Sequence, residues 1–184
     1  MDRPLDKLPL DRVKWPLFAF LASAAMLAAA HAFEHFLYLA PCPLCYVQRE
    51  IYWGSGAIAI IGIFANWRGA PPRLMSTFCL LLGVTFFAGA GVATYHSLVE
   101  WKILPAPATC AAGSAHLSGD IWEQLGKRQA IPSCDKPMWY LFGLTMANYN
   151  ALASLVFGAA SLFAALRPLR TDTANETGAE AEAA

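Results

Sequence analysis

Four long apolar stretches without any charged side chain dominate this sequence. They run from Trp15 to Phe33, Ile51 to Ala65, Leu74 to Tyr95 and Leu141 to Leu166. A helix needs about 20 mainly apolar residues to cross a bilayer, with a range near 17–25. Three stretches are long enough alone, and the second is long enough only if it includes Tyr46 to Glu50. Such uncharged runs lack the polar face of a surface helix, which argues against a soluble helical core.

Composition and charge support a membrane protein. Of the 184 residues, 57% are apolar and 14% are charged, whereas soluble proteins average about 25% charged residues. The net charge is zero, so no basic field indicates nucleic-acid binding. We therefore predict an all-α membrane protein, a bundle of four transmembrane helices over residues 15–166.

The distribution of basic residues predicts the orientation of this bundle. Cytoplasmic segments carry the excess of Lys and Arg. Eight basic residues flank the stretches on one side: Arg3, Lys7, Arg12, Lys14, Arg68, Arg73, Arg167 and Arg170. The loops on the other side, about 34–45 and 96–140, hold none and four. We expect cytoplasmic termini (1–14 and a disordered tail, 167–184) and two loops on the outer face of the membrane. Cleavage after Ala30-His31-Ala32 is an alternative, but the first stretch is long enough to remain as a span.

The cysteines follow this topology. Cys42, Cys45, Cys110 and Cys134 fall in the two outer loops, while Cys79 lies within a span, where we expect a small packing residue. Outer-face cysteines generally form disulfides. Four cysteines allow three pairings, but a CxxC pair closes locally, which leaves Cys110 with Cys134 as the natural second bridge.

Loop lengths separate the two bridges in energy. Closing the longer loop stabilises by about 3.5 kcal/mol, against roughly 2 kcal/mol for the tight Cys42–Cys45 ring. Strained disulfides are the labile ones, so Cys42–Cys45 is predicted to be a reactive redox pair. The Cys110–Cys134 bridge is either a structural link or a second redox pair.

Arg49 points to the electron acceptor. Cys45 lies where the second helix begins, and Arg49 follows one turn later. Helix N-termini and cations favour the thiolate, and a cation within the membrane would stabilise a reduced quinone. The alternative is that Arg49 extends to the lipid headgroups.

Three blocks of sequence, in order, resemble the bacterial disulfide bond formation protein B (DsbB) family. They are Pro41 to Arg49, then Tyr95 to Trp101 followed by Pro105 to Cys110, and finally Cys134 to Asn150. The resemblance implies a multi-pass protein of the bacterial inner membrane, with both outer loops in the periplasm. It implies a protein-disulfide oxidoreductase that reoxidises a periplasmic DsbA-type thioredoxin-fold protein through Cys110–Cys134. Electrons would then pass through Cys42–Cys45 to ubiquinone or menaquinone beside Arg49. It also implies that His96 lies near the quinone, although an interfacial histidine is an alternative.

Other functions are weaker alternatives. A vitamin K epoxide reductase-like protein would have its CxxC after the loop pair, which is not the order here. A DsbB paralogue with a dedicated partner is an alternative that the sequence does not exclude, because partner specificity lies in the loop surfaces. A metal-binding membrane protein would use Cys42, Cys45, His31 and His35 as ligands, but it leaves Cys110 and Cys134 unexplained. The roles of Glu34 and Glu100, and of a predicted surface helix at 119–128, stay open.

Overall fold

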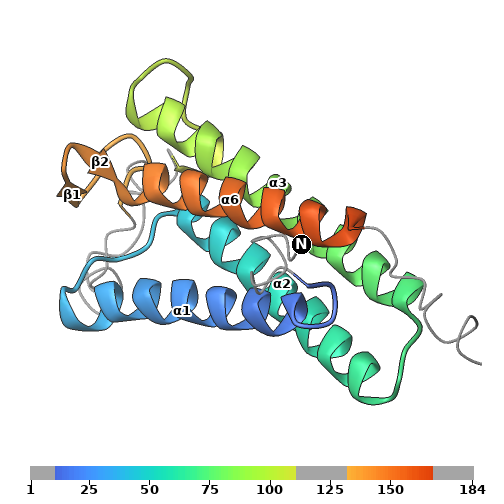
Figure 1. Cartoon of the computed structure of the whole chain (residues 1–184). Helices are drawn as coiled ribbons and strands as arrows, with labels where there is room; N and C mark the ends of the chain where they lie inside the picture. The colour runs from blue at the N-terminus through green and yellow to red at the C-terminus, as the bar shows by residue number, and fades with distance from the viewer. Residues whose placement is uncertain (1–10, 111–131, 168–184) are drawn as a thin grey trace, which may run out of the picture.

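The computed structural model describes residues 11–110 and 132–167, and this part of the chain is mostly helical. It contains α1 (Trp15–Phe36), α2 (Pro43–Trp67), α3 (Pro72–Glu100) and α6 (Met146–Leu166), with a hairpin of β1 (Tyr140–Leu141) and β2 (Leu144–Thr145) before α6 (Figure 1). The predicted surface helix at 119–128 and nearly all of the predicted disordered tail lie outside the described residues.

Three of these helices, α1, α3 and α6, are long and apolar enough to cross a membrane. Large apolar side chains such as Val84 and Val156 are exposed on their outer faces, at 67% and 62%, as expected of surfaces that face lipid. The fourth helix, α2, is not among these candidates, and Arg49 and Glu50 lie near its start.

The helices pack in the order α1, α2, α3, α6, and the contact between α3 and α6 is the most extensive (Figure 1). Glycines allow this close approach, since a Cβ on Gly158 would lie 3.1 Å from the Phe87 ring. Cys79 is completely buried in the core between the helices. This burial confirms the prediction that Cys79 is a packing residue.

The start of the fourth helix corrects a prediction. The apolar stretch begins at Leu141, but α6 begins five residues later, at Met146. The reason is local, because Phe142 and Gly143 adopt positive φ angles of 48° and 78°, which form the tight two-residue turn of a β-hairpin. Thr145 then starts α6 by accepting the backbone N–H of Asn148, as an N-cap residue does.

Candidate redox site

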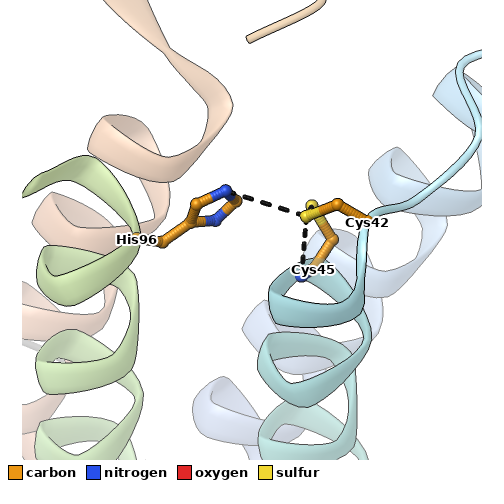
Figure 2. A group of neighbouring side chains, drawn as sticks. All are labelled: Cys42, Cys45 and His96. Carbon is orange, nitrogen blue, oxygen red and sulfur yellow. Dashed lines mark hydrogen bonds between the residues drawn. The ribbon is translucent and has the colours of Figure 1, made fainter. Parts of the chain in front are cut away.

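Two cysteines lie at the start of α2. Cys42 is the N-cap residue, and its sulfur accepts the backbone N–H of Cys45 at 3.2 Å. The two sulfurs are free thiols 2.7 Å apart, and a disulfide bond is about 2.05 Å long. Figure 2 shows both sulfurs facing His96, which reaches toward them from α3. The two sulfurs are therefore close enough to form a disulfide after a small movement, once an oxidant removes two electrons and the thiol protons leave.

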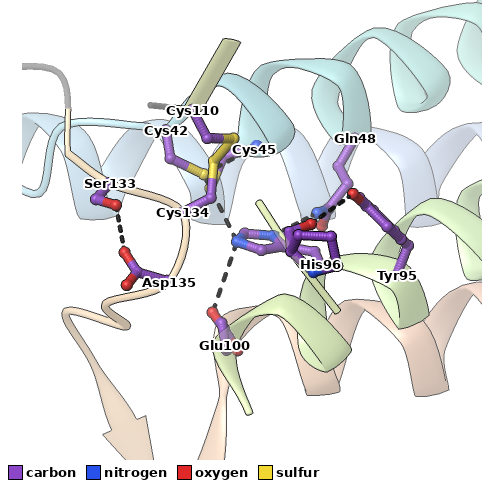
Figure 3. The surroundings of a disulfide bond; sticks show 11 residues. Cys42, Cys45, Gln48, Tyr95, His96, Glu100, Cys110, Ser133, Cys134 and Asp135 are labelled. Atoms are coloured by element: carbon purple, nitrogen blue, oxygen red, sulfur yellow. Dashed lines mark hydrogen bonds and ion pairs between the residues drawn. A yellow bond between two sulfur atoms is a disulfide. The ribbon is translucent and has the colours of Figure 1, made fainter. Parts of the chain in front are cut away.

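The second pair is joined. Cys110 and Cys134 form a disulfide with a Cα–Cα distance of 5.6 Å, as the sequence predicted. This bridge is buried in one cluster with Cys42 and Val99 (Figure 3). The structure thus brings all four predicted cysteines together, and Cys42 belongs to the buried cluster that contains the bridge.

Two groups outside the helices have shifted ionisation. The hydrogen bond with Cys45, followed by burial, holds the pKa of Cys42 far above its ordinary value, so this thiol is neutral at pH 7. A hydrogen bond from Ser133 lowers the pKa of the partly exposed Asp135 carboxyl. The negative charge next to Cys134 is therefore retained in mildly acidic solution.

Arg49 turns toward α1. One guanidinium nitrogen is 2.5 Å from Glu34 Oε2, and the other donates to the Ala30 carbonyl at 3.1 Å. The side chains of Arg49 and Glu34 are 13% and 23% exposed. Arg49 is thus held against the bundle rather than extended away from it. Glu34, whose role the sequence left open, is the partner of Arg49, and His31 lies 3.8 Å from the same oxygen.

His96 is buried within a network of polar side chains that sequence reasoning missed. Its Nδ1 is 2.9 Å from Gln48 Nε2, and Gln48 Oε1 accepts a hydrogen bond from Asn150. Asn150 in turn accepts the hydroxyl of Tyr52 at 2.6 Å. All four side chains are buried. Gln48 and Asn150 carry the signal that was available, since polar side chains inside apolar helices are costly and usually functional.

A cavity of about 330 Å³ opens beside these groups. Apolar residues of α1 and α6, such as Leu27, Phe33 and Met146, form much of its lining. Its polar lining includes Cys45, Arg49, Gln48, His96 and Glu100. An apolar cavity with a few converging polar groups is typical of a small-molecule site.

The predicted metal alternative does not match this arrangement. In the part of the chain that the structure describes, the sulfurs of Cys42 and Cys45 group with His96 rather than with His31 and His35. One ring nitrogen of His96 already faces Gln48, and the other lies 3.7 Å from both Cys42 Sγ and Glu100 Oε1. We interpret this group as a hydrogen-bonded thiol pair.

Comparison with known proteins agrees with the geometry. The family model described as "Disulfide bond formation protein DsbB" matches residues 12–164. Proteins named "Disulfide bond formation protein B" from Marinobacter nauticus and Azoarcus sp. are 30% and 31% identical. These alignments cover 80% and 85% of this chain, and 88% and 93% of the two relatives. No solved structure matches the chain significantly.

The family match and the apolar helices both indicate that the protein lies in a membrane. Three helices that could cross a membrane, together with a family model over most of the chain, support a multi-pass inner-membrane protein. The family forms disulfide bonds and is linked to quinone. The chain therefore belongs to the DsbB family and is a protein-disulfide oxidoreductase.

Proposed function

We propose that this protein reoxidises a periplasmic DsbA-type thiol oxidase and passes the electrons to a membrane quinone. The observation that carries the proposal is the burial of the Cys110–Cys134 disulfide with Cys42, beside a cavity that Cys45 and Arg49 line. Cys110–Cys134 would accept electrons from the soluble partner, and Cys42–Cys45 would reoxidise it.

The proposal includes a four-span topology. Residues 15–166 form the membrane domain, with α2 as a fourth span, and residues 1–14 and 167–184 are cytoplasmic. The loops at about 34–45 and 96–140, with all four cysteines, face the periplasm. The length of α2, 25 residues, supports this reading, because it exceeds the roughly 20 residues that a bilayer requires. The ion pair with Glu34 reduces the cost of placing Arg49 in this helix.

Disulfide exchange between the two cysteine pairs moves two electrons from the reduced loop pair to Cys42 and Cys45. A thiolate of the reduced Cys110/Cys134 pair attacks one sulfur of the Cys42–Cys45 disulfide, and a mixed disulfide forms as the other sulfur leaves. The second loop thiolate then attacks the loop-cysteine sulfur of this mixed disulfide. The attack restores the Cys110–Cys134 bond and releases the other sulfur as a thiolate. Two electrons and the corresponding protons remain on Cys42 and Cys45.

The cavity fits a quinone as electron acceptor. Its apolar walls suit a substituted ring, while Arg49 and His96 offer N–H donors to carbonyl oxygens. A bound ubiquinone or menaquinone would accept two electrons and two protons. Arg49 would hold the ring and stabilise negative charge on it, and His96 would hold its polar edge.

Anaerobic quinone reduction by the purified full-length protein tests the proposal. A reduced DsbA-type protein is the donor, and ubiquinone and menaquinone are compared as acceptors. We expect Cys45→Ser to lose the reaction and Arg49→Ala to show a raised KM for quinone. Cys79→Ala is the matched control, since Cys79 is a free thiol buried in the core, and it should retain activity.

Two outcomes would change the conclusion. A well-folded wild type that reduces neither quinone would overturn the electron path. Reduction with dithiothreitol but not with the DsbA-type donor would instead indicate a paralogue that serves a dedicated partner.

A further inference from the structure

The polar network around His96 determines which of its ring nitrogens carries the proton. Tyr52 donates its hydroxyl to Asn150 Oδ1, and Asn150 Nδ2 donates to Gln48 Oε1. The remaining amide group of Gln48, Nε2, therefore faces His96 Nδ1 at 2.9 Å. An amide nitrogen only donates, so Nδ1 accepts. A neutral imidazole that accepts at Nδ1 carries its proton on Nε2.

This Nε2–H faces more than one acceptor, because the backbone carbonyl of Cys134 also accepts a hydrogen bond from the His96 ring. Cys42 Sγ is 3.7 Å from Nε2, and Glu100 Oε1 is also 3.7 Å away. Glu100 already accepts the Thr145 hydroxyl at 2.5 Å. A charged sulfur attracts a donor more strongly than a neutral thiol does. The hydrogen bond from His96 therefore moves toward Cys42 when that sulfur becomes a thiolate.

We propose that Gln48 and Asn150 are positioning residues, which keep the His96 proton on Nε2 so that it stabilises the Cys42 thiolate during disulfide exchange. This inference rests on the proposed function, because it assigns His96 a role in the exchange between the cysteine pairs. The three residues come from α2, α6 and α3, so the packing of three helices sets the position of one proton.

The step that uses this proton is the release of Cys42. In the mixed disulfide between Cys42 and a loop cysteine, the second loop thiolate attacks the loop sulfur. The new S–S bond is Cys110–Cys134, the bond to Cys42 breaks, and its electron pair stays on the Cys42 sulfur. Burial makes this charge costly, and a hydrogen bond from His96 offsets part of the cost. The proton stays on Nε2, and no further oxidant is required.

Several charged groups line the same cavity. Arg49 and Lys136 bring positive charge, and Glu100 offers the competing carboxyl group. Substitutions at Gln48 and Asn150 leave these three groups in place. A change in Cys42 ionisation in such variants therefore reports on the network rather than on the surrounding charge.

The first measurement is the rate of Cys42 alkylation by iodoacetamide as a function of pH. The full chain in detergent carries Cys45→Ser and Cys79→Ala, so that Cys42 is the free thiol while the second pair stays joined. In this background, Asn150→Leu breaks the network and Gln48→Met removes the donor to His96. Ser161→Ala is the control, because Ser161 is buried on the same helix as Asn150 but accepts from Trp15.

We expect both network variants to be alkylated roughly tenfold more slowly than the control at neutral pH, as follows from losing a hydrogen bond to a charged group. Thermal unfolding checks that each variant is folded, and one folded variant suffices. Nitrogen NMR of the histidine-labelled protein gives a second signature. Wild type should show His96 protonated at Nε2, and the network variants should show it protonated mainly at Nδ1.

Either of two results would overturn the inference. One is a wild-type His96 protonated at Nδ1. The other is an alkylation profile that equals that of Ser161→Ala in every network variant that folds. Neither measurement involves quinone or the soluble partner, so a failure of the proposed electron path would be recognised separately in the quinone assay.

Discussion

The ion pair between Arg49 and Glu34 allows a quantitative prediction. Two unit charges about 4 Å apart attract by about 4 kcal/mol at an effective dielectric constant of 20. Water reaches the pair, since the side chains are 13% and 23% exposed. Arg49 also keeps the Ala30 carbonyl as an acceptor. We therefore predict a coupling energy of about 2 kcal/mol, above the 0.2–1 kcal/mol of exposed pairs and below the 3–5 kcal/mol lost when a buried pair is broken.

A double-mutant cycle measures this coupling. Unfolding free energies are determined in mixed micelles for wild type, Glu34→Gln, Arg49→Met and the double variant. Glu50→Gln combined with Arg49→Met is the control, because Glu50 is an exposed neighbour and should show no coupling. A value below about 0.5 kcal/mol for Glu34 and Arg49 would mean that the pair behaves as an exposed one.

The same variants separate the ion pair from the proposed role of Arg49 in quinone binding. Arg49→Met should raise the KM for quinone about tenfold, the loss expected for one hydrogen bond from a charged donor. Glu34→Gln retains an acceptor for the guanidinium group and should change this KM by less than about threefold. Equal losses in both variants would contradict the proposal that Arg49 contacts the quinone, and would leave it a structural role.

Three further predictions concern the cysteines and the helix packing. Cys134→Ser should destabilise the protein by about 3.5 kcal/mol through loss of loop closure, measured by unfolding without reductant; an unchanged stability would refute this. Gly158→Ala should destabilise by about 1 kcal/mol, because its Cβ meets the Phe87 ring at 3.1 Å and overpacking outweighs the gain in helix propensity. Gly91→Ala, with nothing within 4 Å, should not destabilise, and equal effects would exclude the packing argument. The pKa of Cys42 is raised on folding from an ordinary value of 9.0. The contribution of Cys42 to the free energy of unfolding is therefore complete below pH 9 and is lost as the pH rises further. In reduced protein, Cys42→Ala should remove this part of the pH dependence. An unaltered slope of the unfolding free energy against pH would argue against this prediction.

The apolar stretches predicted the helices well where hydrophobicity alone decides. The start of α1 at Trp15 agrees with the prediction. The start of α6 does not, because the two left-handed residues Phe142 and Gly143 form a turn inside an apolar run. Hydropathy measures the cost of transfer and contains no information on backbone conformation. α2 also extends beyond its uncharged stretch, since Glu34 on a neighbouring helix provides a partner for Arg49.

The candidate site was predictable in its reactive residues and not in its supporting ones. The spacing of Cys42 and Cys45 carries a recognisable pattern, and so does Arg49 one turn later. Gln48 and Asn150 are about a hundred residues apart and meet only because α2 and α6 both pack against α3. No local sequence pattern predicts such a contact. Only the rarity of an amide side chain in an apolar helix could have drawn attention to them.

The position of Cys42 as the N-cap of α2 links the redox state to the start of a helix. The Cys42 sulfur accepts the backbone N–H of Cys45, and its strength as an acceptor follows its charge, so that a thiolate caps more strongly than a thiol or a disulfide. Each turnover would therefore alternately tighten and loosen the first turn of α2. Amide hydrogen exchange at Cys45 becomes a readout of electron flow, although this amide itself carries no electrons.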